Sequence, residues 1–315
     1  MEGQFFKDLR VKPNYFLNIN TKKNYNKNFL NKAVNKLAKL YKLINPDYII
    51  NQGDTNSVLA SALAYKKIKN KIQSKLVHVE AGIRSFDKKM PEEINRITAD
   101  KLSDILFAPT QIAKKNLINE KIDKNKIYVV GNTISDTIQN NKHLIKKINN
   151  LKKYFFLTLH RPETVDKAHR FKKIIKTFIK ISKFLNIKII FPIHPRTEKK
   201  IAKLNIKNYE NLIIIRPCSY FKSLSLQKNS KLILTDSGGI QEEACILNRP
   251  CVTIRKNTER PETLLIKSNI LVGYKSKSIK KGILNMIKTK KKWSNPYGKS
   301  VSKKILKILI KKNEK

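Results

Sequence analysis

Short apolar runs alternate with longer amphipathic stretches along the first half of the chain. The runs predict buried β-strands at Tyr48–Asn51, Leu76–Val79, Ile105–Ala108 and Ile127–Val130. Apolar residues at helical spacing predict intervening helices over Thr55–Lys69, Glu92–Leu102 and Gln111–Asn119. Because helical stretches separate the strands, the pattern indicates βαβ units and a parallel sheet.

The same alternation restarts after a polar stretch, rich in Lys and Asn, at residues 140–153. It predicts further strands at Phe155–Leu159, Ile187–Ile193, Leu212–Ile215, Leu232–Thr235 and Cys251–Ile254. A chain of 315 residues is also longer than a typical single domain with one hydrophobic core. We therefore predict two α/β domains, residues 1–150 and residues 151–300, each built on a parallel sheet.

Polar segments follow five of the predicted strands. They are Gly53-Asp54-Thr55, His78-Val79-Glu80-Ala81-Gly82, His160-Arg161-Pro162-Glu163, His194-Pro195-Arg196 and Asp236-Ser237-Gly238-Gly239. In open parallel sheets, ligands bind beyond the carboxyl ends of the strands. Five such segments from two halves predict an active site in the cleft between the two domains.

The segment Ser237-Gly238-Gly239 opens a predicted helix and suits a phosphate group. Glycines let a ligand approach the backbone, and a helix N-terminus presents N–H groups and a partial positive charge. Glu243, in the first turns of the same helix, could reach ribose hydroxyls. The alternative is that Asp236 or Ser237 only caps the helix.

Arg260 follows the next strand, in Thr258-Glu259-Arg260-Pro261-Glu262. Its guanidinium could clamp a phosphate or a carboxylate bidentately. The alternative is a surface loop with one local ion pair.

Acid–base candidates fall mostly in the first half. Asp54 and Glu80 end neighbouring strands, and Glu92 follows Pro91 at a helix start, where Glu92 or Glu93 must also balance the helix dipole. Clustered carboxylates can supply one acid and one base. His160, which ends a strand in the second half, could move a proton or stabilise a leaving phosphate.

The net charge of +45 invites a nucleic-acid reading. The charge is spread along the whole chain, however, and comes from 58 Lys against only 10 Arg. A solvated lysine surface is the preferred interpretation, with nucleic-acid binding as a minority hypothesis.

Apolar runs are too short to span a bilayer, and the first residues lack a signal peptide, so we expect a soluble cytoplasmic protein with no membrane partner. The three cysteines and five histidines lack metal-ligand spacing, and no dinucleotide fingerprint is present. We therefore expect neither a metal nor a cofactor.

Together these segments resemble the non-hydrolysing UDP-N-acetylglucosamine 2-epimerases. The matching stretches are GDT at 53–55, HVEAGIRS at 78–85, MPEEINR at 90–96, GNT at 131–133, HR at 160–161, TDSGGIQEE at 235–243, TERPE at 258–262 and NPYG at 295–298. They occur in the family's order and cover essentially the whole chain.

The resemblance implies two Rossmann-like domains of the GT-B type, with the helix at residues 301–315 packed back on the first. It implies interconversion of UDP-GlcNAc and UDP-ManNAc, or of a related UDP-2-acetamido sugar, by anti elimination of UDP and its re-addition. By similarity, Asp54, Glu80, Glu92 and His160 match the catalytic residues. Ser237, Gly238, Gly239, Glu243 and Arg260 match the UDP-binding residues. A homodimer is also implied.

One departure from the family pattern leaves alternatives open. The family begins with a strand and a GTRPE-type turn, and Met1-Glu2-Gly3-Gln4-Phe5-Phe6 resembles a point after that unit. This predicts a truncated first domain, and hence an inactive nucleotide-sugar-binding protein as one alternative. Another enzyme of the GT-B type, such as a glycosyltransferase, is the second alternative.

Overall fold

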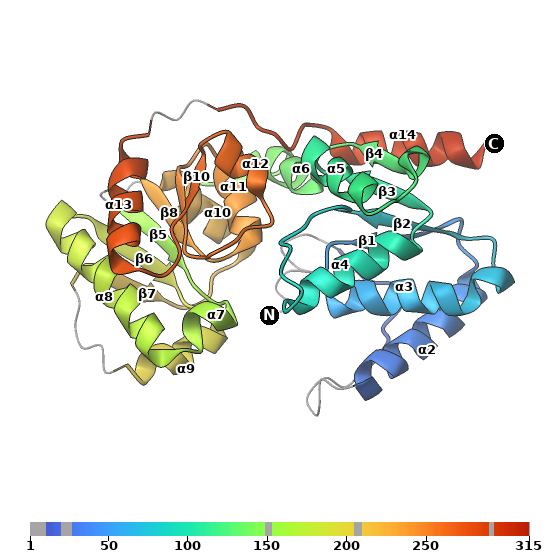
Figure 1. Ribbon diagram of the computed structural model, residues 1–315, viewed down its shortest axis with the longest axis horizontal. Helices are drawn as coiled ribbons and strands as arrows, with labels where there is room; N and C mark the ends of the chain where they lie inside the picture. The colour runs from blue at the N-terminus through green and yellow to red at the C-terminus, as the bar shows by residue number, and fades with distance from the viewer. Residues whose placement is uncertain (1–10, 20–26, 149–152, 205–209, 290–292, 315) are drawn as a thin grey trace. The chain divides into compact units, whose positions relative to one another are not determined.

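The computed structural model describes residues 11–19, 27–148, 153–204, 210–289 and 293–314. The chain divides into two compact units (Figure 1). The N-terminal unit comprises Lys12–Asp136 and Tyr297–Lys315, and the C-terminal unit comprises Thr137–Pro296. The first boundary therefore lies between Asp136 and Thr137, inside a helix. No helix in the described ranges is long and apolar enough to cross a membrane.

The N-terminal unit contains a four-stranded parallel sheet in the order β1-β2-β3-β4. Its elements are α2 (Lys27–Ile44), β1 (Tyr48–Gln52), α3 (Asn56–Ile68), η1 (Lys69–Lys71), β2 (Lys75–Val79), α4 (Pro91–Leu102), β3 (Ile105–Ala108), α5 (Gln111–Asn119), η2 (Lys124–Lys126), β4 (Ile127–Val129) and α14 (Val301–Asn313). Helix α6 (Thr133–Asn140) contains the boundary. The predicted strands and helices of this half are confirmed to within one residue at each end.

The C-terminal unit contains a six-stranded parallel sheet in the order β10-β9-β8-β5-β6-β7. Its elements are η3 (Lys142–Leu144), β5 (Tyr154–Thr158), α7 (Pro162–Val165), α8 (Ala168–Leu185), β6 (Lys188–Pro192), α9 (Pro195–Ala202), β7 (Leu212–Ile215), α10 (Tyr220–Asn229), β8 (Leu232–Thr235), α11 (Gly238–Ile246), β9 (Cys251–Thr253), α12 (Pro261–Leu265), β10 (Asn269–Leu271) and α13 (Ser276–Ile287). All five predicted strands are confirmed. Strand β10 was not predicted, although the short apolar run Ile270-Leu271-Val272 overlaps it.

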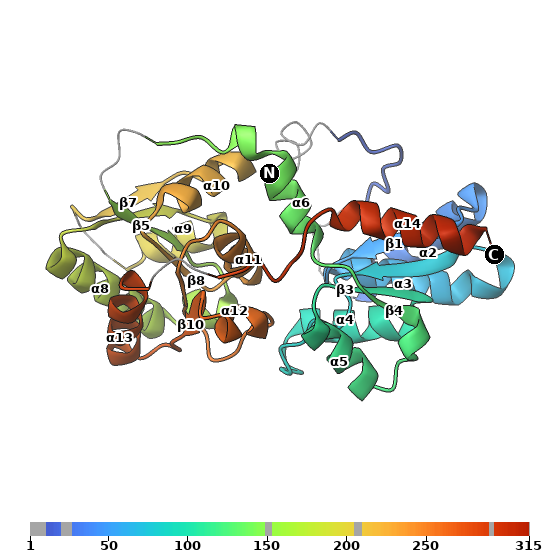
Figure 2. The same ribbon diagram turned by 90° about the horizontal axis from the view of Figure 1, so that it is seen from above.

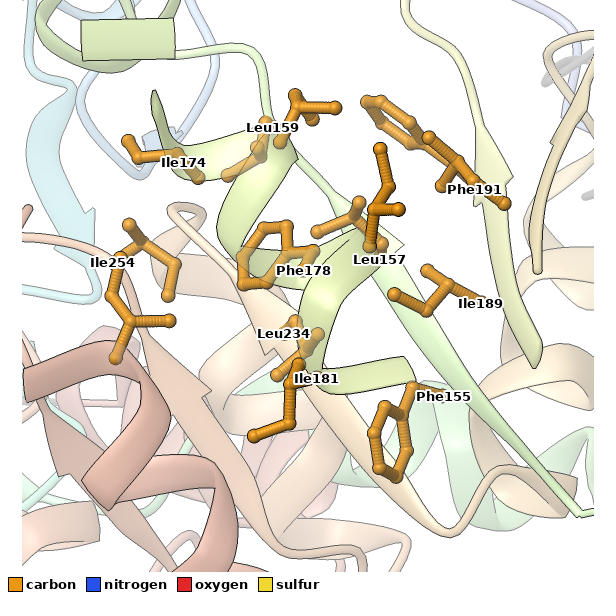
Figure 3. Close-up of a cluster of buried hydrophobic side chains, with 14 of the residues drawn as sticks. Phe155, Leu157, Leu159, Ile174, Phe178, Ile181, Ile189, Phe191, Leu234 and Ile254 are labelled. Atoms are coloured by element: carbon orange, nitrogen blue, oxygen red, sulfur yellow. The ribbon is translucent and has the colours of Figure 1, made fainter. Parts of the chain in front are cut away.

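Helix α8 covers one face of this sheet (Figure 3). Its apolar residues recur at helical spacing, so Ile174, Phe178 and Ile181 point the same way and pack against Leu157 and Leu234 of the central strands. Burying each such side chain contributes about 1.5–3 kcal/mol. This core makes the C-terminal unit a rigid base for the turns at the ends of its strands.

Helix α14, far from β2 in sequence, closes one face of the N-terminal sheet (Figures 1 and 2). Val301, Ile305 and Leu309 pack against the strands, and the Tyr48 hydroxyl donates to the carbonyl of Leu309 at 2.8 Å. The unit is therefore built from both ends of the chain.

The strand registers bring the polar turns together in pairs. In the N-terminal unit Gln52 lies opposite Val79, so the turns that follow β1 and β2 are neighbours. In the C-terminal unit Thr235 lies between Thr158 and Thr253, so the turn after β8 has the turns after β5 and β9 on either side. The parallel topology thus creates one cluster of polar turns in each unit.

Candidate active site

Glu80 stands in a strained turn at the end of β2. Its φ is +69°, a left-handed conformation that costs a residue with a Cβ about 1–3 kcal/mol and is common at active sites. The Gln52 amide donates to Glu80 Oε1 at 3.0 Å and to Thr133 Oγ1 at 2.9 Å. This fixed partner aims a partly exposed carboxylate.

Asp54 lies in the neighbouring turn, where Gly53 has φ +81°. Its Oδ2 accepts hydrogen bonds from Arg96 Nη2 at 2.7 Å and from Arg96 Nε at 3.1 Å. The Asn95 amide also holds the carbonyl of Asp54 at 2.9 Å. Helix α4 therefore anchors the Asp54 turn, and the partly exposed carboxylate is held as an ion pair with a buried guanidinium.

The structure separates the roles of Glu92 and Glu93. Glu93 is 1% exposed and accepts hydrogen bonds from the backbone and hydroxyl of Ser85 and from the backbone of Phe86, all within 3.0 Å. Its remaining partner is Arg96, at 2.6 Å. Glu93 therefore holds the loop after β2, and Glu92, partly exposed in the first turn of α4, is the carboxylate open to a ligand.

Two of the motif segments meet in the N-terminal unit. The backbone N–H of Asn132 donates to the carbonyl of Tyr297 at 2.9 Å, and Ser135 Oγ donates to the carbonyl of Gly298 at 2.8 Å. A Cβ on Gly131, whose φ is +103°, would lie 2.3 Å from the Tyr297 oxygen. These contacts fix the segment that carries Thr133, the second partner of Gln52.

In the C-terminal unit, buried Asp236 fastens the turn after β5. Its carboxylate accepts the backbone N–H of His160 at 3.1 Å and of Arg161 at 3.0 Å, and lies 3.4 Å from His160 Nδ1. Ser237 is the N-cap of α11 but its side chain makes no capping hydrogen bond. A side-chain cap from Ser237 is therefore ruled out, and the Asp236 carboxylate is engaged by the turn after β5. The His160 ring, 37% exposed at its side chain, lies 5.6 Å from the His194 ring.

Arg260 lies beside the glycine turn. A Cβ on Gly238 would be 3.7 Å from Glu259 Oε2 and 3.9 Å from Arg260 Nη2, whereas a Cβ on Gly239 would meet nothing within 4 Å. Arg260 Nε donates to Glu242 Oε1 at 2.5 Å, so the local ion pair of the alternative reading also exists. The glycine turn thus has a guanidinium on one side and open space on the other.

Two further arginines share Glu259 with Arg260. Arg255 Nη1 donates to Glu259 at 2.6 Å, and Arg161 Nη2 lies 3.3 Å from it. Burial alone would raise the Glu259 pKa, but Arg255, Arg260 and Arg161 lower it to about 2. The cluster thus groups three guanidinium cations around the buried carboxylates of Glu259 and Glu242.

Glu243 is buried behind the same turn. Gln227 Nε2 donates to its carboxyl at 2.6 Å, and Tyr220 is a second hydrogen-bond partner. Burial is the main cause that raises its pKa to about 7, and the two hydrogen bonds oppose it. Glu243 is thus a titratable hydrogen-bonding group near the predicted phosphate turn.

The predicted residues fall into two sets. Asp54, Glu80 and Glu92 belong to the N-terminal unit, while His160, Ser237, Gly238, Gly239, Glu243 and Arg260 belong to the C-terminal unit. Sequence reasoning missed Gln52 and Gln227, for which no motif gave a signal, and Arg255, which lies just before a recognised segment. Among the described residues, no group of three or more His, Cys, Asp or Glu could hold a metal ion.

Comparisons with known proteins agree along the whole chain. A family model described as UDP-N-acetylglucosamine 2-epimerase matches residues 1–310. A UDP-N-acetylglucosamine 2-epimerase of Methanococcus maripaludis is 46% identical over 321 residues, covering 97% of this chain and 86% of the relative. That of Methanocaldococcus jannaschii is 44% identical over 324 residues, covering 98% and 87%. The crystal structure of the M. jannaschii UDP-GlcNAc 2-epimerase in complex with UDP-GlcNAc and UDP has a TM-score of 0.90, covering 98% of this chain and 88% of that one.

Proposed function

The chain belongs to the UDP-N-acetylglucosamine 2-epimerase family, and we propose that it inverts C2 of UDP-GlcNAc, or of a related UDP-2-acetamido sugar, by eliminating UDP and adding it back. It is accordingly an isomerase with the GT-B type of fold. The observation that carries the proposal is the pair of turns that places Asp54 and Glu80 side by side, each held by its own partner.

The C-terminal set would hold the nucleotide. The N-terminus of α11, with no side-chain cap, and the cationic cluster around Arg260 suit a diphosphate. Ionised Glu243 would accept the ribose hydroxyls. His160, fixed by Asp236, would stabilise the departing phosphate oxygen.

The N-terminal carboxylates would act on the sugar. In the first step a carboxylate removes the C2 proton, the C1–C2 double bond forms and the C1–O bond to the diphosphate breaks, giving UDP and a 2-acetamidoglucal. In the second step a proton is delivered to the opposite face of C2 and the diphosphate oxygen re-forms its bond to C1. Asp54, Glu80 and Glu92 supply the acid and the base for these transfers.

Incubating the protein with UDP-GlcNAc in D2O tests the proposal. NMR should show UDP-ManNAc and deuterium at C2 of both sugars, because the abstracted proton exchanges with solvent. Glu80→Gln should lower kcat at least 100-fold, on the order expected for losing an acid–base group, whereas Glu198→Gln, at an exposed position in α9, should leave kcat unchanged. Absence of both UDP-ManNAc and C2 deuterium from the wild-type reaction would refute the proposal.

Family membership also supports a cytoplasmic homodimer as the working form. Light scattering coupled to size-exclusion chromatography measures the assembly directly. A mass of about twice 36.5 kDa is expected, and a monomer at the concentration of the activity assay would contradict it.

A further inference from the structure

A histidine lies buried beneath the turns that carry Asp54 and Glu80. His78, in β2, is 0% exposed, and each of its ring nitrogens has a partner: Nδ1 lies 2.6 Å from Asp100 Oδ1, and Nε2 lies 2.9 Å from the carbonyl oxygen of Gly53. Its position inside the predicted strand Leu76–Val79 suggests simple packing. Its two hydrogen bonds show a more specific arrangement.

The partners determine how many protons the ring carries. A carbonyl oxygen can only accept a hydrogen bond, so Nε2 must donate. Asp100 accepts two further donors at Oδ2, Arg84 Nη2 at 2.6 Å and the backbone N–H of Gly82 at 3.1 Å, and its pKa is lowered by the neighbouring cations, so it is an ionised acceptor. Nδ1 must therefore donate as well. A ring with two donors is an imidazolium.

Neighbouring charges sustain this buried cation. Burial alone would lower the His78 pKa, but Asp100 and, more weakly, Glu80 raise it above its ordinary value. Burial alone would raise the pKa of Asp100, but His78 and Arg84 lower it. Arg84 is also paired with Glu120, at 2.7 Å. Two cations and two anions thus balance in the network, and one member of each sign is fully buried.

The network joins the three segments that carry the proposed carboxylates. Nε2 fixes the Gly53 carbonyl, one residue before Asp54. Asp100 fixes the backbone N–H of Gly82, two residues after Glu80. Glu80 itself has a left-handed backbone conformation. Asp100 also belongs to α4, the helix that begins next to Glu92.

We propose that His78, as a buried imidazolium paired with Asp100, is a positioning residue that holds the Asp54 and Glu80 turns in register for catalysis. This rests on the proposed epimerase function. Both ring nitrogens are engaged by Asp100 and by the carbonyl of Gly53, so His78 acts on the two turns through their backbone.

The ring's charge can be tested without any turnover. In protein carrying ¹⁵N-labelled histidine, long-range ¹H–¹⁵N spectra distinguish imidazolium from the two neutral tautomers, and the signal lost in His78→Asn identifies the residue among five histidines. We expect a doubly protonated ring at pH 7 that resists deprotonation as the pH rises. A neutral tautomer at pH 7 would overturn the proposal.

The positioning role is tested with two variants. Asn can replace the Nδ1 donor and Gln the Nε2 donor, but neither spans both partners. Each should lower kcat on the order of 100-fold, the size expected for a displacement of about 1 Å at a reacting group. The Kd for UDP should stay within about twofold, because the proposed UDP residues lie in the C-terminal unit. His143→Gln, at an exposed position, is the matched control.

The possible results distinguish the positioning role of His78 from the proposed epimerase activity. Unchanged kcat in either folded variant refutes positioning, and loss of UDP binding together with kcat shows that His78 is only structural. If the wild type itself forms no UDP-ManNAc, the proposed function fails and the positioning claim falls with it, while the ring spectrum still decides the charge state.

Discussion

The carboxyl of Glu243 combines a proposed role in UDP binding with a cost in stability. It is buried, and its pKa is raised from 4.5 to about 7, chiefly by burial. Gln227 and Tyr220 already supply its hydrogen bonds within the fold. An isosteric amide at this position should therefore fold more stably and bind UDP more weakly.

The size of the gain in stability of Glu243→Gln follows from the raised pKa of Glu243. The folded state binds more protons than the unfolded state between pH 4.5 and pH 7, so stability falls as the pH rises through this window. A shift of this size corresponds to about 3 kcal/mol of lost stability above pH 7. Glu243→Gln removes the titration, so its advantage should be about 3 kcal/mol at pH 8 and less than about 1 kcal/mol at pH 5.

The chain contains its own probe for this measurement. Trp293 is its single tryptophan, and its indole N–H donates to the carbonyl of Cys245 at 3.0 Å, in the same helix as Glu243. Urea unfolding followed by tryptophan fluorescence at pH 5 and pH 8 therefore reports on α11. Glu198→Gln, at an exposed position, serves as the control and should show no pH-dependent change.

The affinity for UDP should fall in the same variant whose stability rises. A carboxylate offers two charged acceptor oxygens to the ribose hydroxyls and an amide only one neutral one, so Glu243→Gln should raise the Kd for UDP roughly 10- to 100-fold at pH 8. Any protonation of UDP itself is the same in the wild-type and variant titrations, so the ratio of the two Kd values reports the effect of Glu243 alone. Equal stability of variant and wild type at pH 8, or an equal slope of stability with pH, would refute this account of the buried carboxyl.

Three other changes test separate parts of the structure. Arg96→Lys cannot reproduce the guanidinium contacts to both Asp54 and Glu93, so kcat should fall about 10- to 100-fold with an unchanged Kd for UDP; an unchanged kcat would contradict this. Gly82→Ala should destabilise the fold by roughly 2–5 kcal/mol in urea unfolding, because φ is +78° and the new Cβ would lie 2.2 Å from a backbone oxygen. Its control is Gly53→Ala, where φ is +81° but the new Cβ meets nothing within 4 Å, so this change should cost only about 1 kcal/mol. Glu259→Gln should reduce stability at pH 7, and its difference from the wild type should shrink as the pH falls from 4.5 towards 2, where the wild-type carboxyl loses its charge; a constant difference across that range would count against the arginine cluster.

Strand positions and the polar turns were predictable because they depend on local patterns. Buried parallel strands read as continuous apolar runs, and their carboxyl ends mark the ligand side without any knowledge of the partners. Asp54, Glu80 and His160 were proposed as site residues in this way. Strand order was not predictable, since the register that sets Thr235 between Thr158 and Thr253 is a property of the assembled sheet.

The hydrogen-bond partners were the part that sequence could not supply. Glu92 and Glu93 are adjacent and identical in chemistry, and only the loop at Ser85 shows that Glu93 is structural. Gln52 and Gln227 hold proposed site carboxyls from positions with no motif of their own. His78 looked like a packed residue because its partners, Gly53 and Asp100, lie 25 and 22 residues away.

The contrast between lysine and arginine separates composition from chemistry in this chain. Lysine outnumbers arginine 58 to 10, yet the buried carboxylates of Asp100, Glu93, Glu259 and Glu242 pair with Arg84, Arg96, Arg255 and Arg260. A guanidinium keeps its charge when buried and reaches two acceptors in one plane, whereas a buried ammonium readily loses its proton. Lysine could therefore not replace these four arginines without loss of their contacts to the buried carboxylates. The net charge of +45 comes mainly from lysine, whereas these four arginines pair with carboxylates in the interior.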